Sequence, residues 1–248
     1  MSCTAVSCRR LGSAVILAHC ANLTTEARVQ QEFRPPAPQP AVIDGTAGPL
    51  EARVEDPAAG AAPKVVGVVC HPHPLHGGTM QNKVVHTLGR AMQELGAPTV
   101  RFNFRGVGQS AGVYDSGAGE LEDALSVCAW ARQRWSCEAL WLAGFSFGAA
   151  IALEAAATVR PAALVTVAPP VGRLIVAPVL RPGCPWLVVQ GDRDELVDFA
   201  IVRRWVSNFD VPPQMLVLPG AEHFFHGRLG ELRAGVLEFL AQGPVGGL

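Results

Sequence analysis

The sequence predicts an α/β domain in which helices cover both faces of a mostly parallel β-sheet. Strand-like and helix-like segments alternate along most of the chain, as they do in proteins with parallel sheets and crossover helices. Many of the strand-like segments are continuous apolar runs, which is typical of strands buried on both faces. The 248 residues suffice for one sizeable domain, which can bury roughly 70–75% of the surface that its unfolded chain exposes.

The first predicted elements are a hairpin, a buried strand, a helix and a second strand. Residues 41–55 contain two short extended runs about a Gly-containing turn, which indicates a β-hairpin. Residues 64–71, KVVGVVCH, form a β-branched apolar run. Residues 79–95 predict a helix because apolar side chains recur at helical spacing, namely Val84, Val85, Leu88, Met92 and Leu95. Residues 98–104, PTVRFNF, form the next strand.

The same alternation continues to the end of the chain. Helices are predicted over residues 118–135, 148–159, 198–208 and 229–241. Strands are predicted over residues 139–145, 161–169, 185–192 and 213–220. Because the active sites of such sheets lie at the carboxyl ends of the strands, we expect the functional residues in the loops that follow them.

The first forty residues differ from the rest. Residues 1–40 have no sustained period and end in a Pro-rich stretch, so we expect a poorly ordered extension or linker ahead of one domain over residues 41–248. Arg9 and Arg10 followed by LGSAVILA resemble a very short signal peptide, but His19 before Cys20 does not fit a lipoprotein-type cleavage site. We favour the interpretation that residues 1–40 are a disordered tail, or that the start of the sequence was assigned too early.

Composition narrows the partners and the compartment. A formal net charge of −1 gives no electrostatic reason to expect binding to nucleic acid or to an acidic membrane surface, and no apolar stretch reaches the roughly 20 residues that span a bilayer. The seven cysteines include no CxxC pair, which argues against a zinc ribbon or a disulfide scaffold. The sequence therefore predicts a soluble protein of a reducing compartment, the cytoplasm.

A single serine stands where a predicted strand meets a predicted helix. The segment Gly144-Phe145-Ser146-Phe147-Gly148 has the pattern G-x-S-x-G in the strand–turn–helix context that presents a nucleophilic serine. The backbone N–H of Phe147 would then lie at a helix N-terminus, where it can stabilise an oxyanion. A chance occurrence in a Gly-rich chain is the alternative.

A nucleophilic serine needs a base, and the base needs an acid to orient it. After the strand that ends near Gln190, the loop offers Asp192, Asp194 and Glu195 as acids. After the last strand, the chain offers His223 and His226 as bases. The order Ser, acid, His fits this kind of fold.

Five ordered segments together resemble the α/β-hydrolase superfamily, and more closely its small, lidless bacterial serine hydrolases related to dienelactone hydrolases and acyl-protein thioesterases. The segments are HPHPLHGGTMQNK, RFNFRGVGQSAG, LAGFSFGA, VVQGDRDELV and GAEHFFHGR. The resemblance spans about residues 41–242 and implies an α/β-hydrolase fold without a large cap domain.

The resemblance also implies roles for single residues. Asp194 would be the acid, with Asp192 shaping the turn and Glu195 facing solvent, and His223 would be the base, with His226 on the surface. The backbone N–H of His73 would be the second oxyanion donor, with that of Leu75 as the alternative. Pro72 and Pro74 have no N–H to donate.

Two other motifs invite different interpretations. His71, His73 and His76 are clustered as zinc ligands can be, but only Cys70 stands nearby as a further ligand, and a structural or oxyanion loop is favoured. Arg105 opens a Gly-rich turn that does not complete a phosphate-binding motif. We expect Arg105 to pair with a carboxylate or carbonyls beneath the site, and Glu120, Glu122 and Asp123 to be surface or packing residues.

The expected activity is hydrolysis of a small carboxylic ester or thioester by Ser146, His223 and Asp194, with no metal or organic cofactor. Leu75, Leu174 and Phe224 are candidates for the apolar walls of the substrate pocket. No segment suggests an extended cleft for a peptide. A non-catalytic binding module and an acyltransferase on the same scaffold are the alternatives.

Overall fold

The computed structural model describes residues 37–56, 62–175 and 179–243. Most of the predicted extension, residues 1–36, lies outside the described part, as do Cys3, Cys8 and Cys20. The boundary predicted between an extension and a domain therefore stays a prediction.

Every strand and helix predicted from the sequence is present, with ends that differ by a few residues. The strands are β1 (Gln39–Gly45), β2 (Gly48–Glu55), β3 (Val66–Cys70), β4 (Thr99–Phe102), β5 (Leu140–Phe145), β6 (Ala163–Val167), β7 (Trp186–Gly191) and β8 (Gln214–Leu218). The helices are α2 (Lys83–Glu94), α3 (Ala118–Trp135), α4 (Phe147–Val159), α5 (Phe199–Ser207) and α6 (Leu229–Ala241), and a 3-10 turn covers Pro74–His76.

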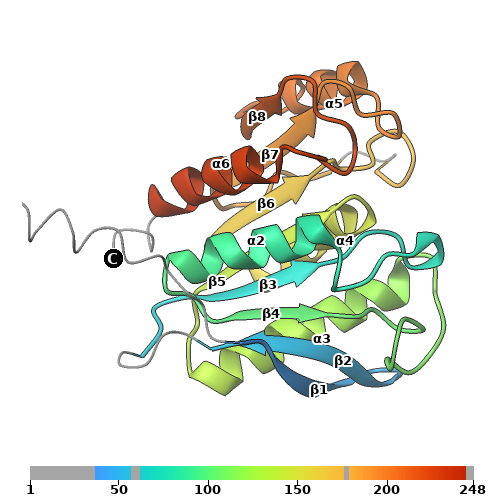
Figure 1. The fold of residues 1–248 in the computed structure, drawn as a ribbon, viewed down its shortest axis with the longest axis vertical. Coiled ribbons are helices and arrows are strands. Elements are labelled where there is room, and N and C mark those ends of the chain that lie inside the picture. Colours follow the sequence, from blue (N-terminus) through green and yellow to red (C-terminus); the bar gives the residue numbers. More distant parts are fainter. Residues whose placement is uncertain (1–36, 57–61, 176–178, 244–248) are drawn as a thin grey trace, which may run out of the picture. The chain divides into compact units, whose positions relative to one another are not determined.

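The strands form one sheet in the order β1-β2-β4-β3-β5-β6-β7-β8. The hairpin β1–β2 is antiparallel and joins the sheet antiparallel to β4, whereas all the other neighbours are parallel (Figure 1). The chain order reverses between β3 and β5, which are neighbours although β4 lies between them in sequence. Such a reversal opens a crevice at the carboxyl ends of the strands.

Helices cover both faces of this sheet. Side chains that alternate along each strand face opposite cores, so that Val68 and Leu142 pack in one core while Val69 and Ala143 pack in the other. The first core also receives side chains of α3, α4 and α5, and the second receives those of α2 and α6. Figure 1 shows α2 and α6 in front of the sheet and α3 behind it.

The connection between β6 and β7 holds no cap domain. It runs only from residue 168 to residue 185, and the described part of it folds into a tight turn with an isolated bridge between Val171 and Ile175. The fold is therefore that of a lidless α/β-hydrolase, as predicted.

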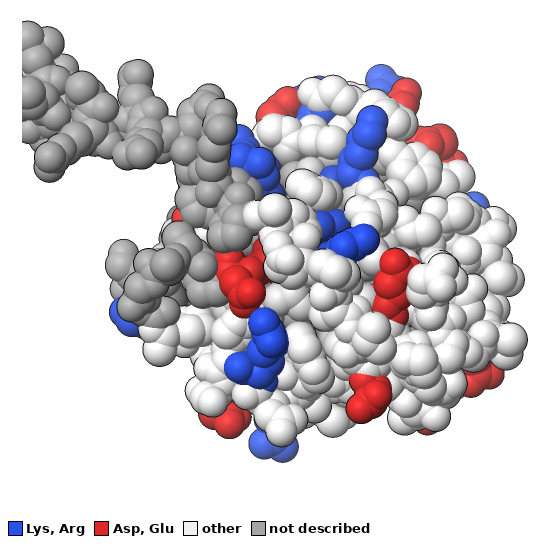
Figure 2. Space-filling model, turned by 60° about the horizontal axis from the view of Figure 1, so that its bottom comes forward, with Lys and Arg blue, Asp and Glu red and all other residues white. Residues whose placement is uncertain are grey.

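Within the described residues, no helix combines the length and the apolar character needed to cross a bilayer. On the face shown in Figure 2, acidic and basic side chains of the described part are interspersed among uncharged residues.

Candidate active site

Ser146 occupies the corner between β5 and α4 in a backbone conformation that few side chains adopt. Its φ is 53° and its ψ is −118°, and the corner is held by a hydrogen bond from the Ser146 N–H to the Val167 carbonyl, 2.9 Å long. A conformation of this kind costs about 1–3 kcal/mol and persists only where the surroundings fix it. The strand–turn–helix context predicted for this serine is present.

The two glycines of G-x-S-x-G are required by close backbone approaches. A Cβ on Gly144 would collide with the Gly148 carbonyl. A Cβ on Gly148 would collide with the carbonyls of Cys70 and His71 at the end of β3. Larger residues would therefore push α4 away from the sheet, and with it the serine.

Ser146, His223 and Asp194 form one chain of hydrogen bonds. The Ser146 Oγ lies 3.1 Å from His223 Nε2, and His223 Nδ1 lies 2.9 Å from Asp194 Oδ2. Because an ionised carboxylate only accepts, Nδ1 carries the proton and Nε2 is left to accept from the serine hydroxyl. The side chains of His223 and Asp194 are 3% and 0% exposed, so this series of hydrogen bonds is shielded from water except at the serine.

Asp194 is fixed by four donors. Its Oδ1 accepts from the N–H groups of Leu196 and Val197 at 2.9 and 2.8 Å, and its Oδ2 accepts from His223 Nδ1 and from Gln190 Nε2, the latter at 2.8 Å. Burial alone would raise the pKa of the Asp194 carboxyl, but the His223 interactions and the two backbone N–H groups together lower it. Asp194 is therefore a carboxylate near neutral pH.

The two other acids of this loop have different tasks. Asp192 Oδ1 accepts from the Gly220 N–H at 2.6 Å and so ties its turn to the end of β8, as predicted. Glu195 is exposed, but its Oε2 also accepts from the His223 backbone N–H at 3.1 Å, a role that the sequence analysis missed. His226 is a surface residue with its side chain 70% exposed, and it lies ahead of α6.

Two backbone N–H groups, those of Phe147 and His73, are the candidate oxyanion donors. The Phe147 N–H lies in the first turn of α4, where a helix has no carbonyl to offer it. The His73 ring packs on the Phe147 ring, with 5.1 Å between centroids, so that the loop after β3 lies against the serine corner. Among the described residues, the His73 N–H has no hydrogen-bond partner.

Leu75 was predicted both as a pocket wall and as the alternative oxyanion donor, and both predictions are wrong. The 3-10 turn Pro74–His76 directs its side chain to solvent, where Leu75 is 66% exposed, and Leu75 does not line the pocket beside Ser146. Its N–H donates to His73 Nδ1 at 3.2 Å and is not available as an oxyanion donor.

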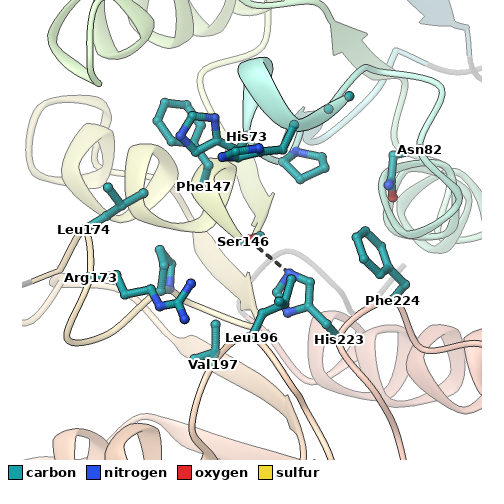
Figure 3. Close-up of a pocket in the computed structure, with 15 residues that line it drawn as sticks. His73, Asn82, Ser146, Phe147, Arg173, Leu174, Leu196, Val197, His223 and Phe224 are labelled. Carbon is teal, nitrogen blue, oxygen red and sulfur yellow. Dashed lines mark hydrogen bonds between the residues drawn. The ribbon is translucent and has the colours of Figure 1, made fainter.

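A cavity of about 530 Å³ opens at Ser146. Its walls include the predicted Leu174 and Phe224, which face each other across Ser146 and His223 (Figure 3). His73, Asn82 and Arg173 also line it. Asn82 lies in the segment HPHPLHGGTMQNK, but no role for it followed from that resemblance. Arg173 was missed because an isolated polar residue in a loop carries no periodic or motif signal.

His71 is buried, and hydrogen bonds occupy its ring. The Phe104 N–H donates to His71 Nε2 at 3.0 Å, so Nδ1 carries the proton and donates to the Pro72 carbonyl at 2.6 Å. Both ring nitrogens are thus engaged. Among the described residues, no three His, Cys, Asp or Glu side chains are grouped as metal ligands would be. His71 is a structural residue that joins β3 to the end of β4.

The buried His71 is expected to make stability pH-dependent. Burial lowers its pKa to about 4, despite the Pro72 hydrogen bond that acts in the opposite sense, from 6.5 for an ordinary histidine. The unfolded chain therefore binds the extra proton first, and the free energy of unfolding falls by about 3 kcal/mol as the pH drops from 6.5 to 4. Urea unfolding at pH values between 6.5 and 4 measures this pH dependence. In a His71→Gln variant the free energy of unfolding should fall less steeply over the same pH range. Parallel curves for the two proteins would contradict the prediction.

Arg105 is a structural residue, as predicted. Its backbone N–H donates to Asp123 Oδ2 at 2.9 Å, and its Nη2 donates to Asp123 Oδ1 at 2.8 Å. Glu120 is buried and accepts from the N–H groups of Asp115 and Gly117 ahead of α3. The Arg105 contacts fix the Gly-rich loop after β4 to α3, and the Glu120 contacts fix the segment that leads into this helix.

The four cysteines of the described part are buried free thiols: Cys70, Cys128, Cys137 and Cys184. Burial raises the pKa of each of them, that of Cys128 to about 12. None of them is a ready thiolate, and none of them lines the cavity at Ser146.

The lidless sheet and the serine at its strand–helix corner define the class of α/β serine hydrolases. Residues 44–184 match the family described as X-Pro dipeptidyl-peptidase (S15 family), a span that includes Ser146 and ends before Asp194 and His223. The chain belongs to this family and, at that level, is a hydrolase of the serine type.

Individual relatives and solved structures resemble this chain over most of its length. An uncharacterized protein of Rickettsia prowazekii, RP471, is 32% identical over 212 residues, covering 80% of this chain and 87% of its own. The lidless α/β serine hydrolase XC6422 of Xanthomonas campestris is 42% identical, with a TM-score of 0.78 over 86% of this chain and 97% of its own. An α/β serine hydrolase homologue from Coxiella burnetii is 50% identical, with a TM-score of 0.78 over 82% and 97%.

Proposed function

We propose that this protein hydrolyses a carboxylic ester or thioester through an acyl-enzyme on Ser146. The observation that carries the proposal is the hydrogen-bonded chain from Ser146 Oγ through His223 to Asp194, which ends in an open cavity. This is the arrangement of nucleophile, base and orienting acid that acyl transfer requires.

Each group has a definite task in the proposed reaction. The Ser146 Oγ attacks the carbonyl carbon while His223 Nε2 takes its proton, and the Asp194 carboxylate stabilises the imidazolium. The N–H groups of Phe147 and His73 bind the developing oxyanion. His223 then protonates the leaving alcohol or thiol, and a water activated by the same nitrogen releases the acid.

The cavity supports a small substrate. Without a cap, its lining combines apolar side chains, such as Leu174 and Phe224, with few polar groups, which suits a short or medium acyl chain. The family name refers to a peptidase, so a peptide substrate is a candidate that the test must include.

A substrate panel tests the proposal. Turnover is measured on 4-nitrophenyl esters of increasing acyl length, on acyl-CoA thioesters and on an X-Pro 4-nitroanilide. We expect the esters or thioesters to be hydrolysed and the anilide to be left intact. Cleavage of the anilide alone would show that the protein is a peptidase and would overturn the proposal. Transfer of the acyl group to an added alcohol in preference to water would make the protein an acyltransferase, and no reaction with any of them would favour a non-catalytic binding module.

The His73 oxyanion donor can be removed by one substitution. The φ of His73 is −53°, within the range that proline requires, so His73→Pro deletes the N–H without demanding a new φ. His73→Ala is the matched control, because it removes the same imidazole and keeps the N–H. We expect kcat of His73→Pro to lie roughly 10²–10³-fold below that of His73→Ala. Equal values of kcat for the two variants would show that His73 is not the donor.

A further inference from the structure

The loop between β6 and β7 holds a positively charged side chain at the cavity. The N–H groups of Arg173, Leu174 and Ile175 all lie within 3.0–3.2 Å of the Pro170 carbonyl, and the Gly172 N–H donates to the Ile175 carbonyl at 3.0 Å. Val171 and Ile175 anchor this turn in the core, each 8% exposed. The turn therefore presents its tip, Arg173 and Leu174, to the cavity from a fixed base.

The Arg173 guanidinium has no counter-charge in the described part of the chain. Arg173 lines the same cavity as Ser146 and His223, and Figure 3 shows its side chain extending from the loop toward them. No hydrogen bond or ion pair joins this side chain to another described residue. The described residues that line the cavity include no Asp or Glu, although the chain has 21 acidic residues.

The two acids that hydrogen-bond to His223, Asp194 and Glu195, are already engaged. The side chain of Asp194 is fully buried and accepts hydrogen bonds from Leu196, Val197, Gln190 and His223. Glu195 accepts from the His223 backbone N–H. An unpaired guanidinium at the rim of a cavity that contains no acid attracts an anion and repels a cation such as a free amino terminus.

We propose that Arg173 selects substrates that carry a carboxylate in addition to the ester or thioester bond. A guanidinium presents two parallel N–H donors that match the two oxygens of a carboxylate. The apolar side chains of Leu174, Val197 and Phe147 line the same cavity and reduce the competition from water. This inference rests on the proposed function, because it assigns the substrate class of the same site.

Two pairs of esters test this inference, each pair differing only in one carboxylate. On the acyl side, the mono-4-nitrophenyl ester of adipic acid is compared with its methyl-capped form. On the alcohol side, 4-butyryloxybenzoate is compared with its methyl ester. The four substrates are measured with wild type, Arg173→Gln, Arg173→Glu and, as a control, Arg204→Gln, whose exposed arginine lies on α5 outside the cavity lining.

Wild type should prefer the anionic member of at least one pair. Arg173→Gln should lower kcat/KM for that substrate roughly tenfold, and for its neutral partner by less than about twofold. Arg173→Glu should reverse the preference, and Arg204→Gln should leave it unchanged. Whether the acyl or the alcohol pair responds shows on which side of the scissile bond the carboxylate lies.

The possible failures are distinguishable. The carboxylate subsite is overturned if wild type hydrolyses the neutral esters as well as their anionic partners. It is also overturned if Arg173→Gln lowers kcat/KM equally for both members of a pair. Either result leaves the hydrolase proposal intact. Wild type that turns over none of the four esters and none of the acyl-CoA thioesters of the substrate panel would overturn both.

Discussion

Replacing Ser146 with alanine is expected to lower kcat on any ester substrate by roughly 10⁴- to 10⁶-fold. The substitution removes the oxygen that would form the proposed acyl-enzyme, and His223 Nε2, 3.1 Å away, loses the hydroxyl that it would deprotonate. The change deletes one oxygen and keeps the backbone of the corner, so the free energy of unfolding should change little. Steady-state kinetics and urea unfolding of the same preparations check both statements.

Ser126→Ala is the matched control for this experiment. Ser126 is half-buried on α3, away from the cavity lining, and within the described part of the chain its hydroxyl bonds only to the Glu122 carbonyl one turn earlier in the same helix. The control should keep wild-type kcat. If Ser146→Ala retained wild-type kcat while folding normally, Ser146 would not be the nucleophile.

Replacing Asp194 with asparagine is expected to lower kcat by roughly 10⁴-fold. Each oxygen of Asp194 accepts from two N–H donors, so one pair of donors must face the new amide NH₂ in place of an acceptor. The imidazole then loses the charge that stabilises it, the geometry that orients it, or both. The variant should also be less stable, because buried donors are left unpaired.

Asp192→Asn separates this effect from a general disturbance of the loop. Asparagine keeps a side-chain oxygen that can accept from the Gly220 N–H, and Asp192 makes no hydrogen bond to His223 among the described residues. We expect kcat to fall by less than about tenfold. A larger loss in Asp192→Asn than in Asp194→Asn would reverse the assignment of the acid.

The fold was predictable because local pattern and burial agree along the chain. The apolar runs at 64–71 and 139–145 became β3 and β5, buried along their whole length at the centre of the sheet. The helix predicted over 118–135 has the bounds Ala118–Trp135, since Gly117 and Ser136 at its ends have positive φ and stop the helical run. The order of the strands depends on pairings between distant segments, which local periodicity does not encode.

The core of the candidate site was predictable for a different reason. Ser146, Asp194 and His223 each follow a parallel strand, and the carboxyl ends of such strands meet at one edge of the sheet. Side-chain direction within short loops was not predictable. Leu75 is apolar and close in sequence to the donor loop, but the backbone of the 3-10 turn sends it into solvent. Arg173 is polar and isolated in sequence, yet its turn presents it to the cavity.

The roles of Gln190 and Glu195 were hidden for a related reason. Gln190 Nε2 donates to Asp194 Oδ2 from the end of β7, a strand whose sequence indicates only burial. The Glu195 carboxylate accepts from the backbone N–H of His223. This contact therefore depends on the path of the chain after β8, and the side chain at position 223 gives no sign of it. Such supporting contacts depend on the tertiary structure and leave no motif in the sequence.

The most direct test of the account is to find which residue a fluorophosphonate labels in the folded protein. We predict a single adduct, located by peptide mass spectrometry on Ser146, that is absent after unfolding in urea and is much slower to form in His223→Ala. A folded protein that takes up no label, or takes it up on another residue, would contradict the proposal that Ser146 is an activated nucleophile.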